Sequence, residues 1–181
     1  MKRVLSGLEV EVVAGDITRQ PDLECVVNAA NALLLPGGGV AGAIHRVAGP
    51  GLLDECLPLA PIRPGEAVLT GGHHLPNKYV VHCLGPIYGQ DEPSDELLAS
   101  CYQNALKLAD QYEITSIGFP SISTGIFRFP MQEASRIALN TVARTAPQLQ
   151  FVRLVRFILF GETAFEIHAD TLGKMQESWI Q

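Results

Sequence analysis

The sequence predicts an α/β fold in which helices pack against a mostly parallel sheet. Short apolar runs of strand length alternate with segments whose apolar residues recur at helical spacing, and glycine or proline separates most of them. The 181 residues, 47% of them apolar, are enough for one domain with its own core. No internal repeat or linker divides the chain, so we expect a single domain over residues 1–181.

The expected strands are short apolar runs, as is typical of strands that are covered on both faces. The predicted strands are residues 8–13, 24–28, 67–70, 79–84, 116–120 and 151–160. Strands that alternate with helices form parallel sheets between helical layers. The first strand shows some alternation of apolar and polar residues, and we expect it to be an antiparallel edge.

The expected helices fill the intervals between these strands. They are residues 40–48, 52–57, 94–112, a segment opened by Pro130, and 162–175. Pro130 suits a first helical position because no amide hydrogen is needed there. In the clearest helix, 94–112, the spacing predicts one buried apolar face made of Leu98, Cys101, Tyr102, Ala105, Leu108, Ala109 and Tyr112.

Composition and charge exclude several classes of function. The net charge is −6 and no basic stripe follows the chain, so nucleic acid is not an expected partner. No apolar run reaches the roughly 20 residues of a membrane span, and the N-terminus lacks a signal-peptide pattern. We therefore expect a cytoplasmic protein without a membrane partner. Any bound phosphate would be held mostly by backbone amides.

Neither the cysteines nor the histidines form a recognisable site. The four cysteines are far apart in apolar surroundings, which favours reduced core thiols. Four histidines lack a carboxylate or cysteine at metal-ligand spacing, namely His73, His74, His82 and His168. We therefore expect no metal and no cofactor.

Candidate site segments lie at the ends of several predicted strands, at the edge where α/β sheets bind ligands. The first is Gly-Asp-Ile-Thr at residues 15–18, in which Asp16 either caps a turn or contacts a ligand. The last is residues 158–162, where Phe160 either packs in the core or stacks on a planar ligand group. Each segment taken alone leaves both alternatives open.

A second segment joins two asparagines to three consecutive glycines. Asn28 and Asn31 lie at the end of a strand, and residues 37–39 precede the predicted helix 40–48. Three glycines cost backbone entropy, and their physical use is close approach of amides to an anion at a helix N-terminus. The asparagines suit ribose hydroxyls, although they could merely close a turn. Their combination with the glycines favours a binding site.

Two familiar phosphate motifs do not fit this segment. Gly37, Gly39 and Gly42 satisfy G-x-G-x-x-G, but they do not directly follow a strand, and no acidic residue ends the next strand at the required distance. No lysine follows the glycines, as a P-loop requires. We therefore exclude the classical dinucleotide fold and the P-loop NTPases.

A further amide-rich segment spans residues 119–130, between a buried strand and the helix opened by Pro130. Its small hydroxyl residues and glycine predict a second concave backbone surface for an anion. Phe127 and Phe129 flank an arginine in this segment. One of them could cover a sugar ring, and the alternative is a core anchor.

Five motifs occur together in the order and spacing of a known family. They are residues 15–18, 28–31, 37–40, 45–49 and 122–127. With them the chain resembles the macro domain over nearly its whole length, most closely the MacroD-type hydrolases. The resemblance implies a three-layer α/β/α fold around a six-stranded mixed, mostly parallel sheet, with ADP-ribose or its derivatives as ligand.

The resemblance also implies a role for each site residue. Asp16 would accept a hydrogen bond from the adenine amino group beside Ile17, and Phe160 would stack on the ring. Asn31 would hold the distal ribose. The diphosphate would lie on the amides of two loops, namely those around Gly38, Gly39 and Val40 and those of Ser123, Thr124, Gly125, Ile126 and Phe127.

The chain departs from the MacroD-type hydrolases at Ala41, where they have an aspartate that activates water. Losing a general base costs about a hundred- to ten-thousandfold in rate. Other macro domains with alanine here are regarded as hydrolases that use the substrate's own phosphate. His45 lies one helical turn after Ala41 and would support catalysis together with Asn31.

Two functions follow from this departure. The favoured one is hydrolysis of mono-ADP-ribosyl-protein or O-acetyl-ADP-ribose, with mono-ADP-ribosylated proteins as partners. The alternative is a non-catalytic module that only reads ADP-ribose.

Overall fold

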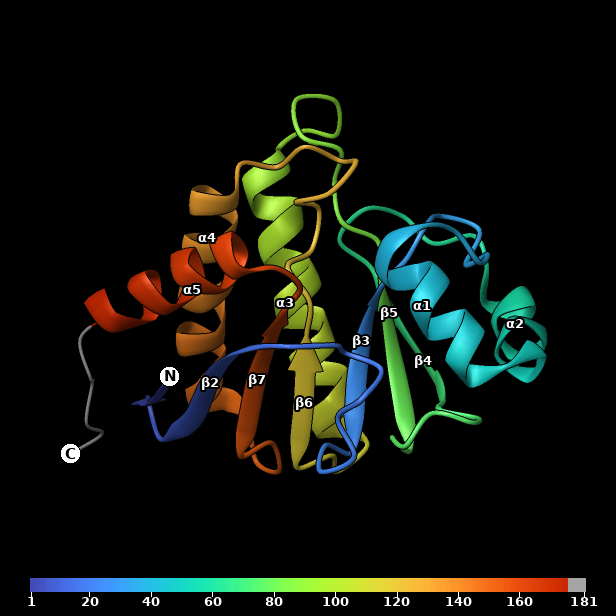
Figure 1. The fold of residues 1–181 in the computed structure, drawn as a ribbon, viewed down its shortest axis with the longest axis horizontal. Coiled ribbons are helices and arrows are strands. Elements are labelled where there is room, and N and C mark those ends of the chain that lie inside the picture. The colour runs from blue at the N-terminus through green and yellow to red at the C-terminus, as the bar shows by residue number, and fades with distance from the viewer. Residues whose placement is uncertain (176–181) are drawn as a thin grey trace.

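The computed structural model describes residues 1–175, which form one mixed sheet between two layers of helices (Figure 1). The strand order is β1-β2-β7-β6-β3-β5-β4. The pairs β1–β2 and β4–β5 are antiparallel, and the other four pairs are parallel. The strands are β1 Lys2–Leu5, β2 Leu8–Ala14, β3 Cys25–Ala29, β4 Ala67–Gly71, β5 Tyr79–Cys83, β6 Ser116–Phe119 and β7 Leu154–Leu159.

The helices lie between the strands as the sequence predicts. They are α1 Gly39–Ala48, α2 Pro50–Cys56, α3 Ser94–Gln111, α4 Met131–Thr145 and α5 Glu162–Lys174, with short 3₁₀ turns η1 Leu57–Leu59 and η2 Ala146–Gln148. Five residues of the predicted face of α3 are fully buried, whereas Leu108 is only partly buried and Tyr112 is half exposed beyond the helix end.

Three expectations about the sheet are wrong in detail. The sheet has seven strands instead of six, because residues 6 and 7 take positive φ angles and turn the N-terminus back as β1. The strand 8–14 is therefore no edge, since β7 pairs with it in parallel on its other side. The last strand begins at Leu154 and not at Phe151, because the amides of residues 150–152 donate to the carboxylate of Asp110.

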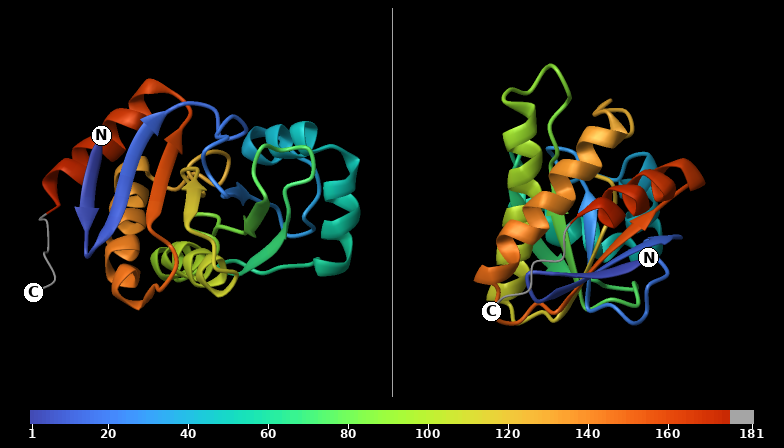
Figure 2. Two further views of the ribbon diagram at one scale, coloured as in Figure 1. Left: turned by 90° about the horizontal axis from the view of Figure 1, so that it is seen from below. Right: turned by 90° about the vertical axis from the view of Figure 1, so that its left-hand side faces the viewer.

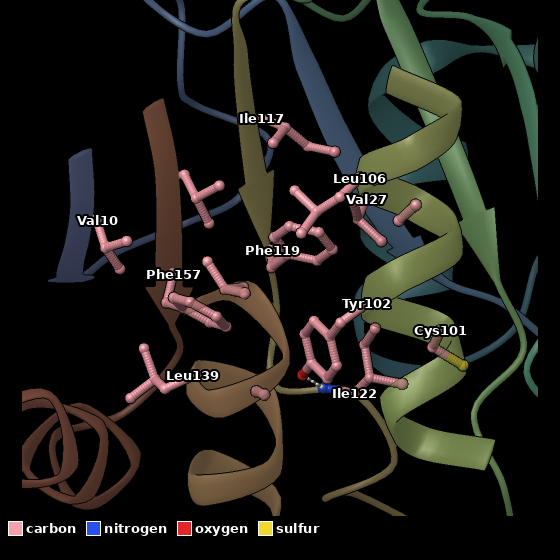
Figure 3. Close-up of a cluster of buried hydrophobic side chains, with 14 of the residues drawn as sticks. Val10, Val27, Cys101, Tyr102, Leu106, Ile117, Phe119, Ile122, Leu139 and Phe157 are labelled. Carbon is pink, nitrogen blue, oxygen red and sulfur yellow. Dashed lines mark hydrogen bonds between the residues drawn. The ribbon is translucent and has the colours of Figure 1, made fainter. Parts of the chain in front are cut away.

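The two faces of the sheet carry separate cores. Helices α3, α4 and α5 cover one face, where the larger cluster includes the packed rings of Tyr102, Phe119 and Phe157 (Figure 3). Helices α1 and α2 cover the other face only over β3, β5 and β4 (Figures 1 and 2). Val26 and Val27 are neighbours on β3 that point into different clusters, as alternation along a strand requires.

An ion-pair network covers the part of this second face that no helix reaches. Arg156 on β7 donates to Glu11 on β2 at 2.6 Å and to Asp22 at 2.7 and 2.9 Å. Lys2 on β1 also pairs with Glu11. Burial by itself would raise the pKa of Glu11, but hydrogen bonds from Lys2 and Arg156 outweigh it and hold that pKa below its usual value.

The cysteines are buried and free, as the sequence predicts. Burial raises the pKa of the Cys56 thiol to about 11 and that of Cys101 to about 12, so both remain protonated at neutral pH. Within residues 1–175, none of the helices is long and apolar enough to cross a membrane.

Candidate functional site

Parallel pairing brings the predicted site segments to one edge of the sheet. The carboxyl ends of β2, β7, β6 and β3 are consecutive in the sheet order and open on the same side (Figure 1). Beyond the end of β2, the Gly15 amide donates to the Leu159 carbonyl at 3.0 Å. Residues 15–18 therefore lie beside Phe160, although nearly the whole chain separates them in sequence.

Asp16 caps a turn and keeps part of its carboxylate exposed. Its Oδ1 accepts hydrogen bonds from the Thr18 amide at 2.9 Å and from the Thr18 hydroxyl at 2.7 Å, as a turn-capping residue does. These bonds lower the pKa of Asp16, so the carboxylate is ionised at neutral pH. Its side chain is still 49% exposed, and Oδ2 lies 3.8 Å from Arg19 Nε. The turn therefore presents a fixed anionic acceptor to the solvent.

Phe160 is 91% exposed, so the core-packing alternative for this residue is wrong. Ile17, across the β2–β7 pair, is buried and only 6% exposed. An aromatic ring held open beside a buried aliphatic side chain and a carboxylate offers a planar ligand both stacking and a hydrogen-bond acceptor.

The first set of amides lies at the start of α1. Gly38 is its N-cap residue, makes no side-chain cap, and the first turn holds no acidic residue. A side chain at Gly38 would meet no atom within 4 Å, so the backbone there faces open space. A Cβ at Gly42 would collide with the Gly37 carbonyl, so glycine lets the loop close onto the helix. The open helix N-terminus favours an anion.

The second set of amides lies in the loop of residues 121–129. The Phe129 amide donates to the Ser123 carbonyl at 2.9 Å and closes the loop, with Ser123 at a φ of 65°. None of the amides of residues 124–127 donates a hydrogen bond within the described part of the chain. Ile126 is 91% exposed, and a side chain at Gly125 would meet nothing within 4 Å. Four free donors therefore surround one open surface.

Contacts from behind fix the shape of the loop 121–129. The Ile122 amide donates to the Tyr102 hydroxyl at 3.2 Å (Figure 3). The Tyr88 amide donates to the Phe127 carbonyl at 2.9 Å, and the rings of Tyr88 and Phe129 lie 4.8 Å apart. A Cβ at Gly85 would collide with Ser123 Oγ, so the chain after β5 packs closely against the loop.

Sequence reasoning did not identify Gly85, Tyr88 or the hydroxyl of Tyr102 as supports of the loop. None of them belongs to a polar motif, and their contacts with the loop come from tertiary packing. Phe129 is 2% exposed, which confirms the core-anchor alternative for this ring. Phe127 is partly buried beside the smaller cluster.

The two asparagines have different surroundings. Asn28 is 1% exposed, and its Nδ2 donates to His82 Nδ1 at 3.0 Å, so the structure places its amide inside the protein and not on the open surface. Asn31 is partly exposed and exchanges two hydrogen bonds with the backbone of Leu35, at 2.7 and 2.9 Å. Its amide keeps a second donor and a second acceptor site for a ligand.

Ala41 and His45 lie one turn apart on α1, and both are buried. Burial lowers the pKa of His45, which favours the neutral ring, and its Nε2 has no partner within residues 1–175. His82 is also neutral, since burial and the nearby His45 lower its pKa to about 3. The side chain of Ala41, near the start of α1, is therefore only a methyl group. The imidazoles of His45 and His82 are neutral and buried.

Residues 1–175 contain no group of three or more His, Cys, Asp or Glu side chains that could hold a metal ion. The candidate site brings together backbone amides, the carboxylate of Asp16, the exposed ring of Phe160 and the side-chain amide of Asn31.

Comparison with known proteins gives concordant matches. A family model described as Macro domain matches residues 27–138. A macro domain-containing protein of Streptomyces coelicolor is 44% identical over 170 residues, which are 91% of this chain and 98% of that protein. An uncharacterized protein of Fusobacterium nucleatum is 49% identical over 136 residues, which are 75% of this chain and 78% of that protein.

Solved structures match over nearly the whole chain. The Oceanobacillus iheyensis macrodomain with ADP has a TM-score of 0.90 at 41% identity, covering 96% of this chain and 94% of that one. A mutant of that macrodomain with ADPR has a TM-score of 0.91 at 40% identity, covering 96% of both chains. A Trypanosoma brucei macrodomain in complex with ADP-ribose has a TM-score of 0.84 at 37% identity, covering 92% of this chain and 69% of that one.

Proposed function

The chain belongs to the macro domain family, and from that premise we propose that it binds ADP-ribose between the start of α1 and the loop 121–129. One observation carries the proposal: two sets of amides that have no acceptor within residues 1–175 face open space at neighbouring strand ends. Such amides favour a diphosphate without cationic side chains, which agrees with the net charge of −6. Solved relatives from Oceanobacillus and Trypanosoma hold ADP or ADP-ribose.

We propose an orientation along the sheet edge for the ligand. The adenine lies between Ile17 and the exposed ring of Phe160, with its amino group donating to Asp16. The diphosphate accepts hydrogen bonds from the amides of residues 38–40 and 123–127. The distal ribose lies toward Asn31, whose remaining donor and acceptor suit its hydroxyls. Phe127 packs against this sugar.

We further propose that the protein hydrolyses ADP-ribosyl derivatives. The oxygen of a water molecule bonds to the anomeric carbon of the distal ribose, while the bond from this carbon to the protein side chain breaks. One proton of the water passes to a diphosphate oxygen, which then donates it to the leaving side chain. With O-acetyl-ADP-ribose, the water oxygen bonds to the acyl carbon, the bond from that carbon to the ribose oxygen breaks, the ribose oxygen takes up the proton, and acetic acid is released.

The substrate must supply the base in this reaction. Ala41 has no group that accepts a proton, and no acidic residue lies in the first turn of α1. His45 is neutral and buried, so we assign it a supporting role. A diphosphate oxygen held by amides beside the distal ribose is then the nearest acceptor that the proposed orientation provides.

Ala41 also supports the second candidate function, a module that binds ADP-ribose without turnover. The two candidates differ in one measurement, the single-turnover release of ADP-ribose from a mono-ADP-ribosylated protein. Release above a buffer blank supports the enzyme, as does deacetylation of O-acetyl-ADP-ribose. Tight ADP-ribose binding by calorimetry, without release of ADP-ribose and without deacetylation, would exclude the enzyme and support the non-catalytic binding module.

The binding proposal has its own test. Asp16→Ala should weaken ADP-ribose binding about tenfold or more in calorimetry, because it removes a charged acceptor from the adenine. Asp54→Ala, an exposed position on α2, serves as the matched control. Undiminished binding by Asp16→Ala would refute the adenine assignment.

A further inference from the structure

Four exposed leucines lie in two chain segments that meet next to Asn31. Leu33 and Leu35 lie in the loop before α1, and Leu57 and Leu59 lie in η1 after α2. Leu33 is 55% exposed and Leu57 is 53% exposed, so neither contributes a buried side chain to the core. We call these four residues the leucine patch.

A backbone hydrogen bond joins the two chain segments that carry the leucine patch. The Ile62 amide donates to the Ala32 carbonyl at 2.9 Å, which places the chain leaving α2 beside the loop after β3 (Figure 1). Beneath the surface, Leu34 and Ile62 are both buried in the smaller core cluster. The intervening side chains therefore anchor the two segments while the leucines face solvent.

The two segments that carry the leucine patch contain no charged residue of their own, although exposed Asp54, Glu55 and Arg63 flank the second segment. Residues 25–45 and 56–62 contain no Asp, Glu, Lys or Arg, although 18% of the whole chain is charged. Exposed apolar surface that lacks charged residues is a recurring property of protein interaction sites. Its composition suits an uncharged apolar partner.

The partner of the leucine patch follows from its position next to Asn31. Asn31, which we assign to the distal ribose, lies two residues before Leu33 and is hydrogen-bonded to the backbone of Leu35. In the proposed orientation the adenine occupies the Asp16–Phe160 end, so whatever is attached to the distal ribose must leave the cleft at the Asn31 end. A protein that carries the ADP-ribosyl group would meet the leucine patch there.

We infer that the leucine patch binds the protein segment that carries the ADP-ribosyl group, and that it selects segments with uncharged apolar residues around the modified position. This inference rests on the proposed binding of ADP-ribose. Leu33, Leu35, Leu57 and Leu59 would then determine which modified protein is bound. The nucleotide site would contact only the ADP-ribosyl group.

The test uses two short peptides that carry ADP-ribose on the central side chain through a linkage that resists hydrolysis. Leucine and valine flank the modified residue in one peptide, and glutamate flanks it in the other. Wild type should bind the apolar peptide more tightly. Leu33→Ser combined with Leu57→Ser should weaken binding of the apolar peptide about tenfold and leave free ADP-ribose unaffected.

The matched control combines Val4→Ser with Tyr112→Ser, two exposed apolar positions on β1 and after α3. It should bind both peptides as wild type does. Equal affinity of the leucine variant and wild type for the apolar peptide would overturn the inference. A self-associating wild type that the leucine variant makes monomeric would also overturn it, because the patch would then join two copies of the chain. Failure of wild type to bind free ADP-ribose would instead refute the proposed function.

Discussion

The amide of Ile122 donates a hydrogen bond of 3.2 Å to the hydroxyl of Tyr102, which is fully buried on α3 (Figure 3). Tyr102 also lies 3.5 Å from the Pro120 carbonyl, so one hydroxyl spans the start of the loop 121–129. A core helix thereby holds the backbone whose amides are candidates for binding the diphosphate.

Tyr102→Phe should weaken ADP-ribose binding about three- to tenfold, because it removes the hydroxyl and leaves the ring packing in place. Calorimetry with adenosine should show no comparable loss, since adenosine has no diphosphate to meet the loop. Tyr112→Phe, at an exposed ring, is the control. An equal loss for adenosine and ADP-ribose would contradict a role specific to this loop.

Phe160→Ala should weaken ADP-ribose binding about fivefold or more without changing the melting temperature. Stacking on an aromatic ring is worth about 1–3 kcal/mol for each base, and a ring that is 91% exposed adds little to the core. Titration calorimetry and thermal unfolding of the same preparation separate the two effects. Phe160→Tyr should bind as wild type does, and a similar loss in that variant would count against stacking.

Ala41→Asp should raise any hydrolysis of mono-ADP-ribosylated protein by about a hundredfold. A carboxylate at this position restores a base, and the positive end of α1 stabilises its charge. Single-turnover assays compare it with Ala41→Asn, which has the same shape and no base. Equal rates for the two variants would mean that water is activated elsewhere.

Asp110→Asn should destabilise the protein by about 1–2 kcal/mol at neutral pH, because the carboxylate accepts bonds from three amides of residues 150–152. Burial by itself would raise the pKa of Asp110, but these bonds outweigh it and lower that pKa. The stabilisation is therefore complete above the unfolded pKa of about 3.9 and is lost as pH falls through the lower folded value.

Urea unfolding at several pH values tests this linkage. The stability difference between wild type and Asp110→Asn should be constant near neutral pH and shrink in acid. A difference that stays constant down to acid pH would show that the carboxylate charge is not the cause. Asp54→Asn, on the exposed side of α2, should not change the unfolding curve.

The sequence predicts the elements of this fold well because their periodicities are strong. The face of α3 around Cys101, Tyr102 and Ala105 repeats at helical spacing and is buried as expected. The strand β1 was missed because four residues with one buried side chain carry almost no pattern. The start of β7 was misplaced because Asp110, more than 40 residues earlier, takes the amides that a longer strand would use.

The candidate site was predictable to the extent that it consists of local motifs. The glycines before α1 and the turn at Asp16 are visible as short segments, and their placement at one sheet edge follows from parallel strands. The supports at Gly85 and Tyr88 were not predictable, since they act through a close approach and a backbone bond to another loop. Burial of Asn28 against His82 likewise depends on the β3–β5 register.

The pairing of β2 with β7 has a consequence for the order in which the site is built. The proposed adenine site combines residues 15–17 with Phe160, whereas both sets of amides proposed to bind the diphosphate lie within residues 37–127. During synthesis from the N-terminus, β7 emerges after β1 to β6. Pairing β7 with β2 closes a loop of most of the chain, which is a slow step. A nascent chain that stops before residue 154 would thus contain both amide loops but lack Phe160, which we propose to stack on the adenine. Selectivity for adenine would then arise only when β7 inserts into the sheet.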